Sequence, residues 1–272
     1  MSHDGTPAFE MRNVGYAYAK DIVALDGVSL TIPRGAMVAI IGANGSGKST
    51  LLRLLDGLYF PSAGQIVAFG ERLTAKRLAD DVFALAFRRR VGLLFQESDV
   101  QLFSPTVWDE VAFGPLHLGL AADEVEARVG AVLADFGLAH LAQRSPYRLS
   151  GGEKKKVALA AVLAVEPEAL LLDEPTANLD PRSVGHLIDI VRAAHCRGRT
   201  IVTATHDLDI VEHIADWVYV LGEDKRLAAQ GPAAEVLADD ALLLATNLVH
   251  SHGHYHDAEV HRHPHRHQPP HH

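Results

Sequence analysis

The sequence has very little cysteine, few aromatic residues and no long apolar run. Cys196 is the single cysteine among 272 residues, which excludes a disulfide framework. The longest apolar stretch, residues 157–165, is far shorter than the roughly 20 residues that span a bilayer. Aromatic residues make up only 6% of the chain, but 48% are hydrophobic and 22% charged, as in ordinary folded proteins. These values predict one large or two small globular domains.

Basic residues are also scarce, because 25 lysines and arginines stand against 34 acidic residues and leave a net charge of −9. This sign disfavours nucleic acid as a partner, since a polyanion needs a basic surface. The N-terminus shows no basic segment followed by an apolar one, so we expect a cytosolic chain that does not span a membrane. Histidine is the outlier, with 17 residues, most of them between His250 and His272.

Hydrophobic periodicity predicts an α/β body with a helical insertion. A glycine-rich loop separates an early strand, residues 37–41, from a leucine-rich segment with helical spacing, residues 49–58. Residues 97–165 have helical character and are interpreted as an inserted subdomain. Strands then alternate with helices, which predicts a largely parallel sheet covered by helices. The other expected strands are residues 9–18, 28–32, 169–172, 200–204 and 217–221, and the other expected helices are residues 123–136, 182–195 and 208–214.

Residues 42–49, with the sequence Gly-Ala-Asn-Gly-Ser-Gly-Lys-Ser, match the phosphate-loop pattern and lie between a predicted strand and a predicted helix. The glycines allow consecutive backbone N–H groups to point at a phosphate, at the positive end of the helix that follows. Lys48 is placed to reach the β and γ phosphate oxygens, and the Ser49 hydroxyl to bind magnesium. The pattern therefore predicts a nucleotide site.

A second strand, residues 170–172, is purely apolar and ends in two carboxylates, Asp173 and Glu174. Nucleotide-binding α/β proteins bind their ligands at the carboxyl ends of such strands. Asp173 would hold magnesium, directly or through water, and Glu174 would polarise the water that attacks the γ-phosphate. Together with the phosphate loop, this pair predicts hydrolysis of the nucleotide.

A second helix start with anion-binding character lies at residues 149–153, Leu-Ser-Gly-Gly-Glu. Ser150 and the two glycines would open a lysine-led helix, whose N-terminus accepts negative charge. Alone, this motif would indicate an ordinary helix cap. One nucleotide does not need two such helix ends, so we expect the second to serve a nucleotide held by another subunit.

In their order, over about residues 8–240, these motifs resemble the ATP-binding cassette ATPases of membrane transporters. The resemblance implies an α/β P-loop NTPase fold with an N-terminal antiparallel β subdomain and an inserted helical subdomain. It implies ATP and Mg²⁺ as ligands. Two departures from the family pattern are Glu153, where many relatives have glutamine, and the run of three lysines, Lys154, Lys155 and Lys156.

The resemblance also assigns roles to single residues. Catalysis would rest on Lys48, on Gln96 as the Q-loop sensor, on Glu174 and on the switch histidine His206. Magnesium would be bound by Ser49, Gln96 and Asp173. Tyr18 would stack on adenine, with Tyr16 as its competitor. The implied nucleotide-binding set is Tyr18, Gly42, Asn44, Gly45, Ser46, Gly47, Lys48, Ser49, Thr50, Gln96, Ser150, Gly151, Gly152, Glu153 and Asp180.

Residues 91–103 and 106–115 narrow the resemblance to the ATPases of energy-coupling-factor importers. Such ATPases work as homodimers or heterodimers with a transmembrane coupling subunit and with membrane subunits that bind the cargo. Leu102 and Phe103 would anchor a short helix of the coupling subunit. The alternative for both residues is packing within the helical subdomain. The resemblance places the chain at the cytoplasmic face of the membrane.

Histidines alternate with other residues in the tail, which we separate as residues 249–272 from an ATPase domain over residues 1–248. In an extended chain this spacing puts imidazoles on one side, and imidazole suits nickel, cobalt, copper and zinc. The tail is expected to be disordered until metal binds. A purification tag is the alternative explanation. The candidate nickel or cobalt ligands are His250, His252, His254, His256, His261, His263, His265 and His267.

The sequence therefore predicts an ATPase subunit that energises import of cobalt or nickel, and it does not separate the two metals. The ATPase of a vitamin importer would carry the same cassette without needing the tail. A soluble nickel-handling GTPase would need an Asn-Lys-x-Asp motif, which does not occur here. A cassette ATPase of chromosome maintenance or translation would need a coiled-coil insertion or a second cassette. Nucleic acid is not an expected partner.

Overall fold

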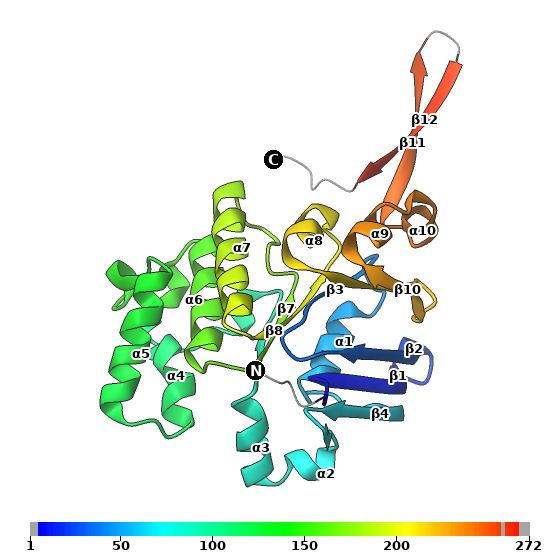
Figure 1. Cartoon of the computed structure of the whole chain (residues 1–272). Helices are drawn as coiled ribbons and strands as arrows, with labels where there is room; N and C mark the ends of the chain where they lie inside the picture. Colours follow the sequence, from blue (N-terminus) through cyan, green and yellow to red (C-terminus); the bar gives the residue numbers. More distant parts are fainter. Residues whose placement is uncertain (1–4, 257–258, 267–272) are drawn as a thin grey trace. The chain divides into compact units, whose positions relative to one another are not determined.

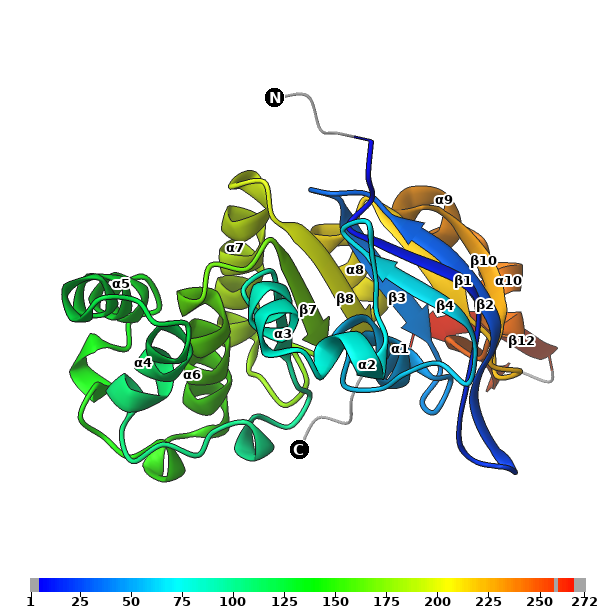
Figure 2. The same ribbon diagram turned by 90° about the horizontal axis from the view of Figure 1, so that it is seen from below.

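The computed structural model describes residues 5–256 and 259–266, with side chains described for residues 5–249. The chain divides into two compact units. Unit 1 comprises Met1–Leu73 and Val202–His272, and unit 2 comprises Thr74–Ile201. Figures 1 and 2 show the strands and helices of both units from two directions.

An antiparallel sheet in unit 1 has the strand order β2-β1-β4-β5. Its strands β1, β2 and β4 are labelled in Figure 2. The predicted strand at residues 9–18 is confirmed by β1. The predicted strand at residues 28–32 is only the second half of β2. The two strands pair along their length, from Phe9 opposite Ile32 to Ala19 opposite Ile22. Asp26 and Gly27 interrupt the apolar alternation, and this explains why the first half was missed. The strands are β1 (Phe9–Ala19), β2 (Ile22–Ile32), β4 (Ala63–Ala68) and β5 (Glu71–Arg72).

The core of unit 1 is built on β3 (Met37–Gly42), in which every residue is buried. β3 pairs in parallel with β9 (Trp217–Leu221), and β9 pairs antiparallel with β10 (Leu227–Pro232). A strand buried on both faces needs apolar residues throughout, as the sequence Met-Val-Ala-Ile-Ile provides. The helices of this unit are α1 (Lys48–Leu55), α8 (Leu208–Ile214), α9 (Ala233–Leu237) and α10 (Asp240–Ala245).

Unit 2 contains a parallel pair of strands, β6 (Val91–Leu94) and β7 (Ala169–Asp173). The next strand, β8 (Thr200–Thr205), crosses the division between the units, and its Thr200 N–H donates to the carbonyl of Glu168. The helices are α2 (Ala75–Leu78), α3 (Asp81–Arg88), α4 (Val107–His117), α5 (Ala122–Asp135), α6 (Gly151–Ala164) and α7 (Pro181–Cys196), with short 3₁₀ turns at η1 (Ser98–Val100), η2 (Ala139–Leu141) and η3 (Pro146–Arg148).

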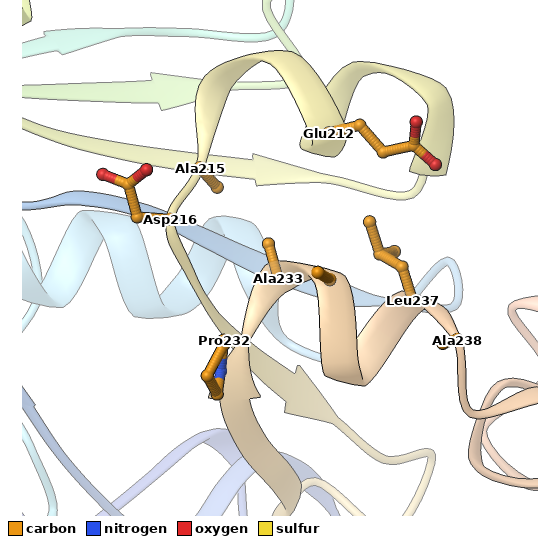
Figure 3. Close-up of a pocket in the computed structure, with 8 residues that line it drawn as sticks. Glu212, Ala215, Asp216, Pro232, Ala233, Leu237 and Ala238 are labelled. Carbon is orange, nitrogen blue, oxygen red and sulfur yellow. The ribbon is translucent and has the colours of Figure 1, made fainter.

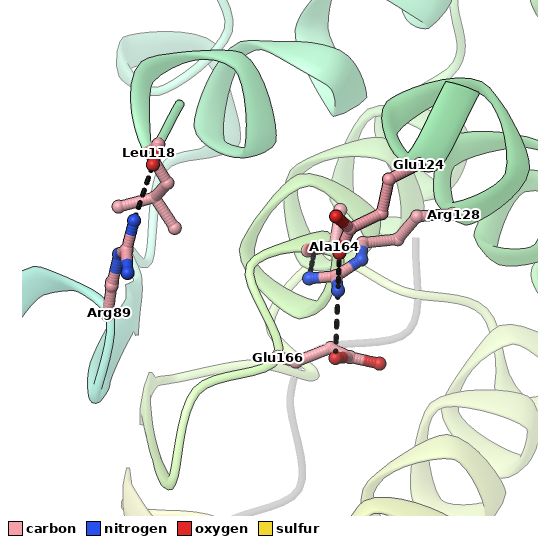
Figure 4. A network of polar contacts seen from close by, with 6 residues as sticks. All are labelled: Arg89, Leu118, Glu124, Arg128, Ala164 and Glu166. Atoms are coloured by element: carbon pink, nitrogen blue, oxygen red, sulfur yellow. Dashed lines mark hydrogen bonds and ion pairs between the residues drawn. The ribbon is translucent and has the colours of Figure 1, made fainter. Parts of the chain in front are cut away.

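Helices α4, α5 and α6 pack together within unit 2, in the part of the chain where helical character was predicted (Figure 1). Arg128 of α5 binds the C-terminal end of α6 (Figure 4). One of its guanidinium nitrogens donates to the Ala164 carbonyl at 3.3 Å. The other, Nη2, lies 2.9 Å from a carboxylate oxygen of Glu124 and 3.2 Å from one of Glu166. Capping of the last carbonyls by a cation stabilises a helix C-terminus. Arg89 makes a similar contact with the Leu118 carbonyl, at the end of α4.

The tail contains two antiparallel strands, β11 (Val249–His256) and β12 (Glu259–Arg266). The period-two alternation of the tail is also the pattern of a strand, which accounts for the pairing. In the part of the chain that the structure describes, no helix is long and apolar enough to cross a membrane.

Gly92 allows β6 and α6 to pack directly against each other. A Cβ at this position would lie 2.5 Å from Cγ1 of Val162, in α6, and 3.2 Å from Cγ of Pro167. Neither atom is the end of a flexible side chain, so a larger residue would force the helix away from the strand. The contact matters for the site because the loop after β6 contains Gln96.

Gly92→Ala should lower the free energy of unfolding by about 1–3 kcal/mol, because the added methyl group overpacks the contact with α6. The measurement is urea unfolding of the purified chain. Gly130→Ala is the matched control: Gly130 lies inside α5 with nothing within 4 Å of an added Cβ. That substitution should leave stability unchanged or raise it by up to ~1 kcal/mol. Equal effects of the two substitutions would contradict the close packing at Gly92.

Candidate nucleotide-binding site

The predicted phosphate loop leaves β3 at Gly42 and enters α1 at Lys48. The Lys48 side chain is buried and folds across its own loop, where Nζ donates to the carbonyls of Gly42 at 2.8 Å and Ala43 at 3.2 Å. Gly47 has a φ of +107°, and a Cβ there would meet the carbonyl oxygen of Ala24. Glycine is therefore required at this position, and the loop has the backbone form that cradles a phosphate.

Two further features of this loop suit an anion. The Ser46 hydroxyl is buried and has no hydrogen-bond partner among the described residues. Lys225, in the turn between β9 and β10, donates from Nζ to the carbonyl of Gly45 at 2.7 Å. Lys225 was missed in the sequence because 180 residues separate it from Gly45. It fixes the tip of the loop from outside.

Three tyrosines of unit 1 form a cluster that distinguishes Tyr18 from Tyr16. The ring of Tyr16 stacks on Tyr59, with centroids 5.2 Å apart and planes 6° apart. Tyr18 meets both rings edge-on, is 49% exposed, and its hydroxyl lies 2.9 Å from Oγ1 of Thr50 in α1. Tyr59 occupies a face of Tyr16, whereas Tyr18 presents an exposed ring beside the phosphate-loop helix. This arrangement favours Tyr18 as the adenine-stacking residue.

His206 follows the last residue of β8, in a turn that leads into α8. The turn is held by Asp207, whose carboxylate accepts from the Asp209 N–H at 3.1 Å and whose own N–H donates to Oγ1 of Thr205. Burial raises the pKa of Asp207. The position of His206 at the end of a buried strand is therefore set by hydrogen bonds on both sides.

In unit 2, Gln96 follows β6 and the acidic pair ends β7. Because β6 and β7 are parallel neighbours, both segments leave the sheet at the same edge. Asp173 and Glu174 are 2% and 5% exposed. Glu174 also has a φ of +44°, an uncommon conformation for a residue other than glycine, and such strain is found at functional positions.

The signature motif at residues 150–153 forms the start of α6. Its serine and glutamate make a capping box: the Ser150 hydroxyl accepts from the Glu153 N–H, and the Glu153 carboxylate accepts from the Ser150 N–H at 2.8 Å. The hydrogen bonds that the N–H and the hydroxyl of Ser150 donate to this carboxylate hold the pKa of Glu153 below its usual value. The departure from glutamine at this position thus preserves the cap, since either side chain supplies the acceptor.

Asp180, one of the predicted nucleotide-binding residues, is the N-cap of α7. One carboxylate oxygen accepts from the N–H groups of Arg182 and Ser183 at 3.0 Å, and the other accepts from the Ser183 hydroxyl at 2.7 Å. The hydrogen bonds from Ser183 lower the pKa of Asp180. The carboxylate therefore fixes the start of α7.

Sequence reasoning missed the buried cation Lys155, because it stands in a run of three lysines that suggests a solvated surface. Its ammonium donates to the Gln96 carbonyl at 2.6 Å. Burial lowers the pKa of Lys155 to about 8, while Asp173 and Glu174 act in the opposite direction. Lys155 is only 3% exposed, and this burial distinguishes it from a surface lysine. The sequence pattern does not reveal it.

The segment proposed to contact a membrane subunit contains one buried and one exposed residue. Leu102 is 4% exposed and belongs to the core, so it does not act as an anchor. Phe103 is 58% exposed and packs edge-on against Phe113, itself 49% exposed, with centroids 4.8 Å apart. Buried Glu110 holds the backbone here by accepting from the N–H groups of Phe103 and Ser104.

A hollow of about 640 Å³ in unit 1 lies at α8, β10 and α9 (Figure 3). Two carboxylates, Glu212 and Asp216, lie at this hollow among mostly apolar lining residues. None of the residues that line it belongs to the predicted nucleotide set. Among the described residues, no group of three histidine, cysteine or acidic side chains is arranged to hold a metal ion. The tail histidine side chains lie outside the described part.

The described structure thus gathers the predicted site in two groups. Unit 1 contains the phosphate loop, Tyr18 and His206, and unit 2 contains Gln96, the signature, the acidic pair and Asp180. A glycine loop with a buried lysine between a strand and a helix, together with a strand that ends in two buried carboxylates, defines a P-loop nucleotide hydrolase.

Residues 25–177 match the family model for ABC transporters, and the chain belongs to this family. It is 56% identical over 247 residues to the nickel import ATP-binding protein NikO of Rhodobacter capsulatus, covering 90% of this chain and 96% of that protein. It is 42% identical to the energy-coupling factor transporter ATP-binding protein EcfA of Methanothermobacter thermautotrophicus, over 88% of this chain and 75% of that protein.

Among solved structures, cbiO1 of Clostridium perfringens, described as part of the ABC transporter complex cbiONQ, matches with a TM-score of 0.76 and 37% identity, over 89% of this chain and 95% of that chain. The predicted cassette fold is confirmed, and the chain is an ATPase of the ABC type.

Tyr18→Ala should raise the dissociation constant for ATP about ten-fold, because a base–aromatic stack contributes ~1–3 kcal/mol. The measurement is titration of the purified Glu174→Gln chain with a fluorescent ATP analogue. Tyr18→Phe is the matched control, since it keeps the ring and loses only the hydroxyl contact with Thr50. If Tyr18→Ala binds ATP as the unsubstituted chain does, the adenine does not stack on Tyr18.

Proposed function

We propose that this chain is the ATP-hydrolysing subunit that energises the import of nickel, or of the closely similar cobalt ion, through a transporter of the energy-coupling-factor type. The observation that carries the proposal is the 56% identity to a relative named for nickel import, over nearly the full length of both chains. The similarity to EcfA and to cbiO1 supports the same transporter type.

In this proposal the glycine loop binds the phosphates of ATP through its backbone N–H groups and Lys48. Ser49, Gln96 and Asp173 have the oxygen ligands that Mg²⁺ prefers. Mg²⁺ held by these residues would neutralise charge on the β and γ phosphates. Glu174 orients the attacking water and accepts its proton, and His206 contacts the γ-phosphate.

The capped start of α6 supplies the second half of a nucleotide site. Ser150 and Gly152 lie at a helix N-terminus, whose backbone N–H groups attract phosphate. We assign this end to the ATP held by a second ATPase subunit, so that ATP stabilises a closed dimer and hydrolysis releases it. Only a difference in ATP affinity between the closed and open dimers can move a membrane partner.

The membrane partner would contact the exposed aromatic pair, Phe103 and Phe113. Paired aromatic rings that are half exposed are typical anchors of protein interfaces. We propose that a transmembrane coupling subunit binds here and that further membrane subunits bind the metal. The chain would then act at the cytoplasmic face of the membrane.

The tail would bind nickel or cobalt through its histidines. The backbone register pairs His252 with His263 and His254 with His261 on β11 and β12. The candidate ligands therefore come from both strands, and imidazole is a ligand that suits nickel and cobalt. Imidazole prefers nickel slightly over cobalt by the general affinity order, so tail binding alone does not identify the cargo.

Glu174→Gln should lower ATP hydrolysis by roughly 10²-fold or more while ATP binding persists, because the general base is lost. In cells that carry the membrane subunits, the same substitution should abolish accumulation of the transported metal. The measurement is uptake of nickel and cobalt by intact cells, beside the hydrolysis rate of the purified chain. Gly130→Ala, a substitution at an open helix position, is the control for expression.

The outcome identifies the cargo. Loss of nickel accumulation alone supports a nickel importer, and loss of cobalt accumulation alone makes cobalt the substrate. If hydrolysis falls but neither metal is affected, the ATPase role stands and metal import is contradicted, and a vitamin becomes the cargo to test.

Truncation after Val249 should leave the basal ATPase rate unchanged and reduce the amount of nickel and cobalt bound per chain. The reason is that the truncation removes the alternating histidines and keeps the buried Leu248 and Val249 of unit 1. Equilibrium dialysis against NiCl₂ or CoCl₂ measures the bound metal. A full-length chain with the eight candidate histidines changed to asparagine separates loss of ligands from loss of the tail. Unchanged binding in both variants would contradict a metal-binding tail.

A further inference from the structure

Lys155 is a buried cation on the signature helix that the proposed reaction does not use. Its side chain is only 3% exposed, and its ammonium donates to two main-chain carbonyls of the loop after β6: that of Gln96 at 2.6 Å and, more weakly, that of Phe95 at 3.4 Å. The Phe95 N–H is bonded in turn to Oε1 of Gln101 at 3.1 Å. The backbone on both sides of the Gln96 side chain is therefore fixed.

The charge of Lys155 also interacts with the acidic pair. Burial disfavours the charged ammonium, and Asp173 and Glu174 favour it. The Lys155 side chain thus joins the signature helix to the loop that contains Gln96 by hydrogen bonds, and its charge also interacts with the carboxylates of Asp173 and Glu174.

Burying the charged Lys155 side chain at this position carries a desolvation penalty that an apolar side chain would not have. The neighbouring buried residues of α6 are apolar: Val157, Ala158 and Leu159 are at most 1% exposed. Replacing a buried charge with an apolar side chain of similar volume is often neutral or stabilising. Packing alone therefore does not explain the ammonium. Its two hydrogen-bond acceptors are what distinguish this position from the rest of the helix.

We propose that Lys155 is a positioning residue for hydrolysis: it fastens the backbone at Gln96 to the signature helix, so that the Gln96 side chain is held ready to bind the Mg²⁺ of ATP. The proposal rests on the proposed role of Gln96. It gives a purpose to Lys155, the middle residue of the lysine run, which the assigned ATPase roles leave unexplained. It also means that α6 and the Gln96 loop move as one body.

Lys154 offers a matched contrast on the same helix. It reaches the same segment, where its ammonium lies 2.6 Å from Oδ1 of Asp99. The Asp99 side chain is 71% exposed, so solvent screens this ion pair and its loss should matter little. Lys154→Met and Lys155→Met therefore remove the same charge from adjacent positions, but only Lys155→Met releases the backbone of Gln96.

The test compares the purified full chain with Lys155→Met, Lys154→Met and Gln96→Ala, using Glu174→Gln as the baseline without catalysis. For Lys155→Met we expect kcat to fall about ten- to hundred-fold, as for other small displacements of a reacting group. The Mg²⁺ concentration for half-maximal hydrolysis should rise, while ATP binding without Mg²⁺ stays within about two-fold of the unsubstituted chain. Lys154→Met should remain within about two-fold in every measurement.

A double substitution decides whether Lys155 acts through Gln96. If it does, the kcat of the double variant Lys155→Met with Gln96→Ala should equal that of Gln96→Ala alone. The reason is that the Gln96 side chain, which Lys155 is proposed to position, is already absent. Additive losses would overturn the proposal. So would normal kcat and normal Mg²⁺ dependence in Lys155→Met while Gln96→Ala is impaired. If Gln96→Ala itself behaves normally, the proposed role of Gln96 fails together with the inference.

Lys155→Gln covers the case in which Lys155→Met unfolds. Glutamine keeps a neutral N–H donor on a chain one atom shorter, so it should recover part of the kcat and of the Mg²⁺ dependence. Thermal unfolding confirms that each variant is folded before its rate is compared. A folded Lys155→Gln chain that shows no recovery relative to folded Lys155→Met would overturn the hydrogen-bonding role.

Discussion

A charge that is buried away from water needs hydrogen-bond partners, and for Lys48, Glu110 and Lys155 those partners are main-chain groups of loops. Lys48 donates to the carbonyls of Gly42 and Ala43, and Lys155 to the carbonyl of Gln96. Glu110 accepts from the N–H groups of Phe103 and Ser104. In each case the hydrogen bonds replace those that the charged group would make with water. The same hydrogen bonds fix a loop that lies outside regular secondary structure.

The same constraint explains why the polar residues lie at strand ends. β3 and β7 are buried along their whole length, and their residues are apolar or glycine until Asp173, the last residue of β7. Polar groups begin where the strand stops: the phosphate loop after β3, Gln96 after β6 and His206 after β8. The buried strands hold the ends of these loops rigidly in place, and the loops carry the polar side chains proposed to bind and hydrolyse ATP.

Much of this could be predicted, because the motifs are local in the sequence. Apolar runs bounded by glycine or acidic residues predicted β3 and β7, and helical spacing predicted α1 and α8. Short or irregular strands were missed: β6 has four residues, and β10 alternates small residues that carry little hydrophobic signal. Strand length and periodicity are the physical basis of such a prediction, and they fail where a strand is too short to show a period.

Contacts between distant parts of the sequence were beyond prediction. The choice between Tyr16 and Tyr18 depends on Tyr59, which stacks on Tyr16 from another part of unit 1. Lys155 looks like part of a solvated run, and only the packing of α6 on β6 makes it a buried residue. In the same way Leu102 and Phe103 are adjacent and similar in hydrophobicity, and the fold alone determines that one is buried and the other exposed.

Residues 95–104 combine these features into one connected segment. Lys155 holds its start at Gln96, Lys154 contacts its middle at Asp99, and Glu110 holds its end at Phe103. These contacts run from Gln96, one of the proposed magnesium ligands, to the exposed Phe103. A partner that displaces Phe103 must therefore stretch or shift backbone that is tied to Gln96, since a segment fixed at several points transmits displacement better than a free loop. If a membrane subunit binds at Phe103 as proposed, the hydrogen bonds that satisfy these buried charges would also connect that subunit physically to the hydrolysis site.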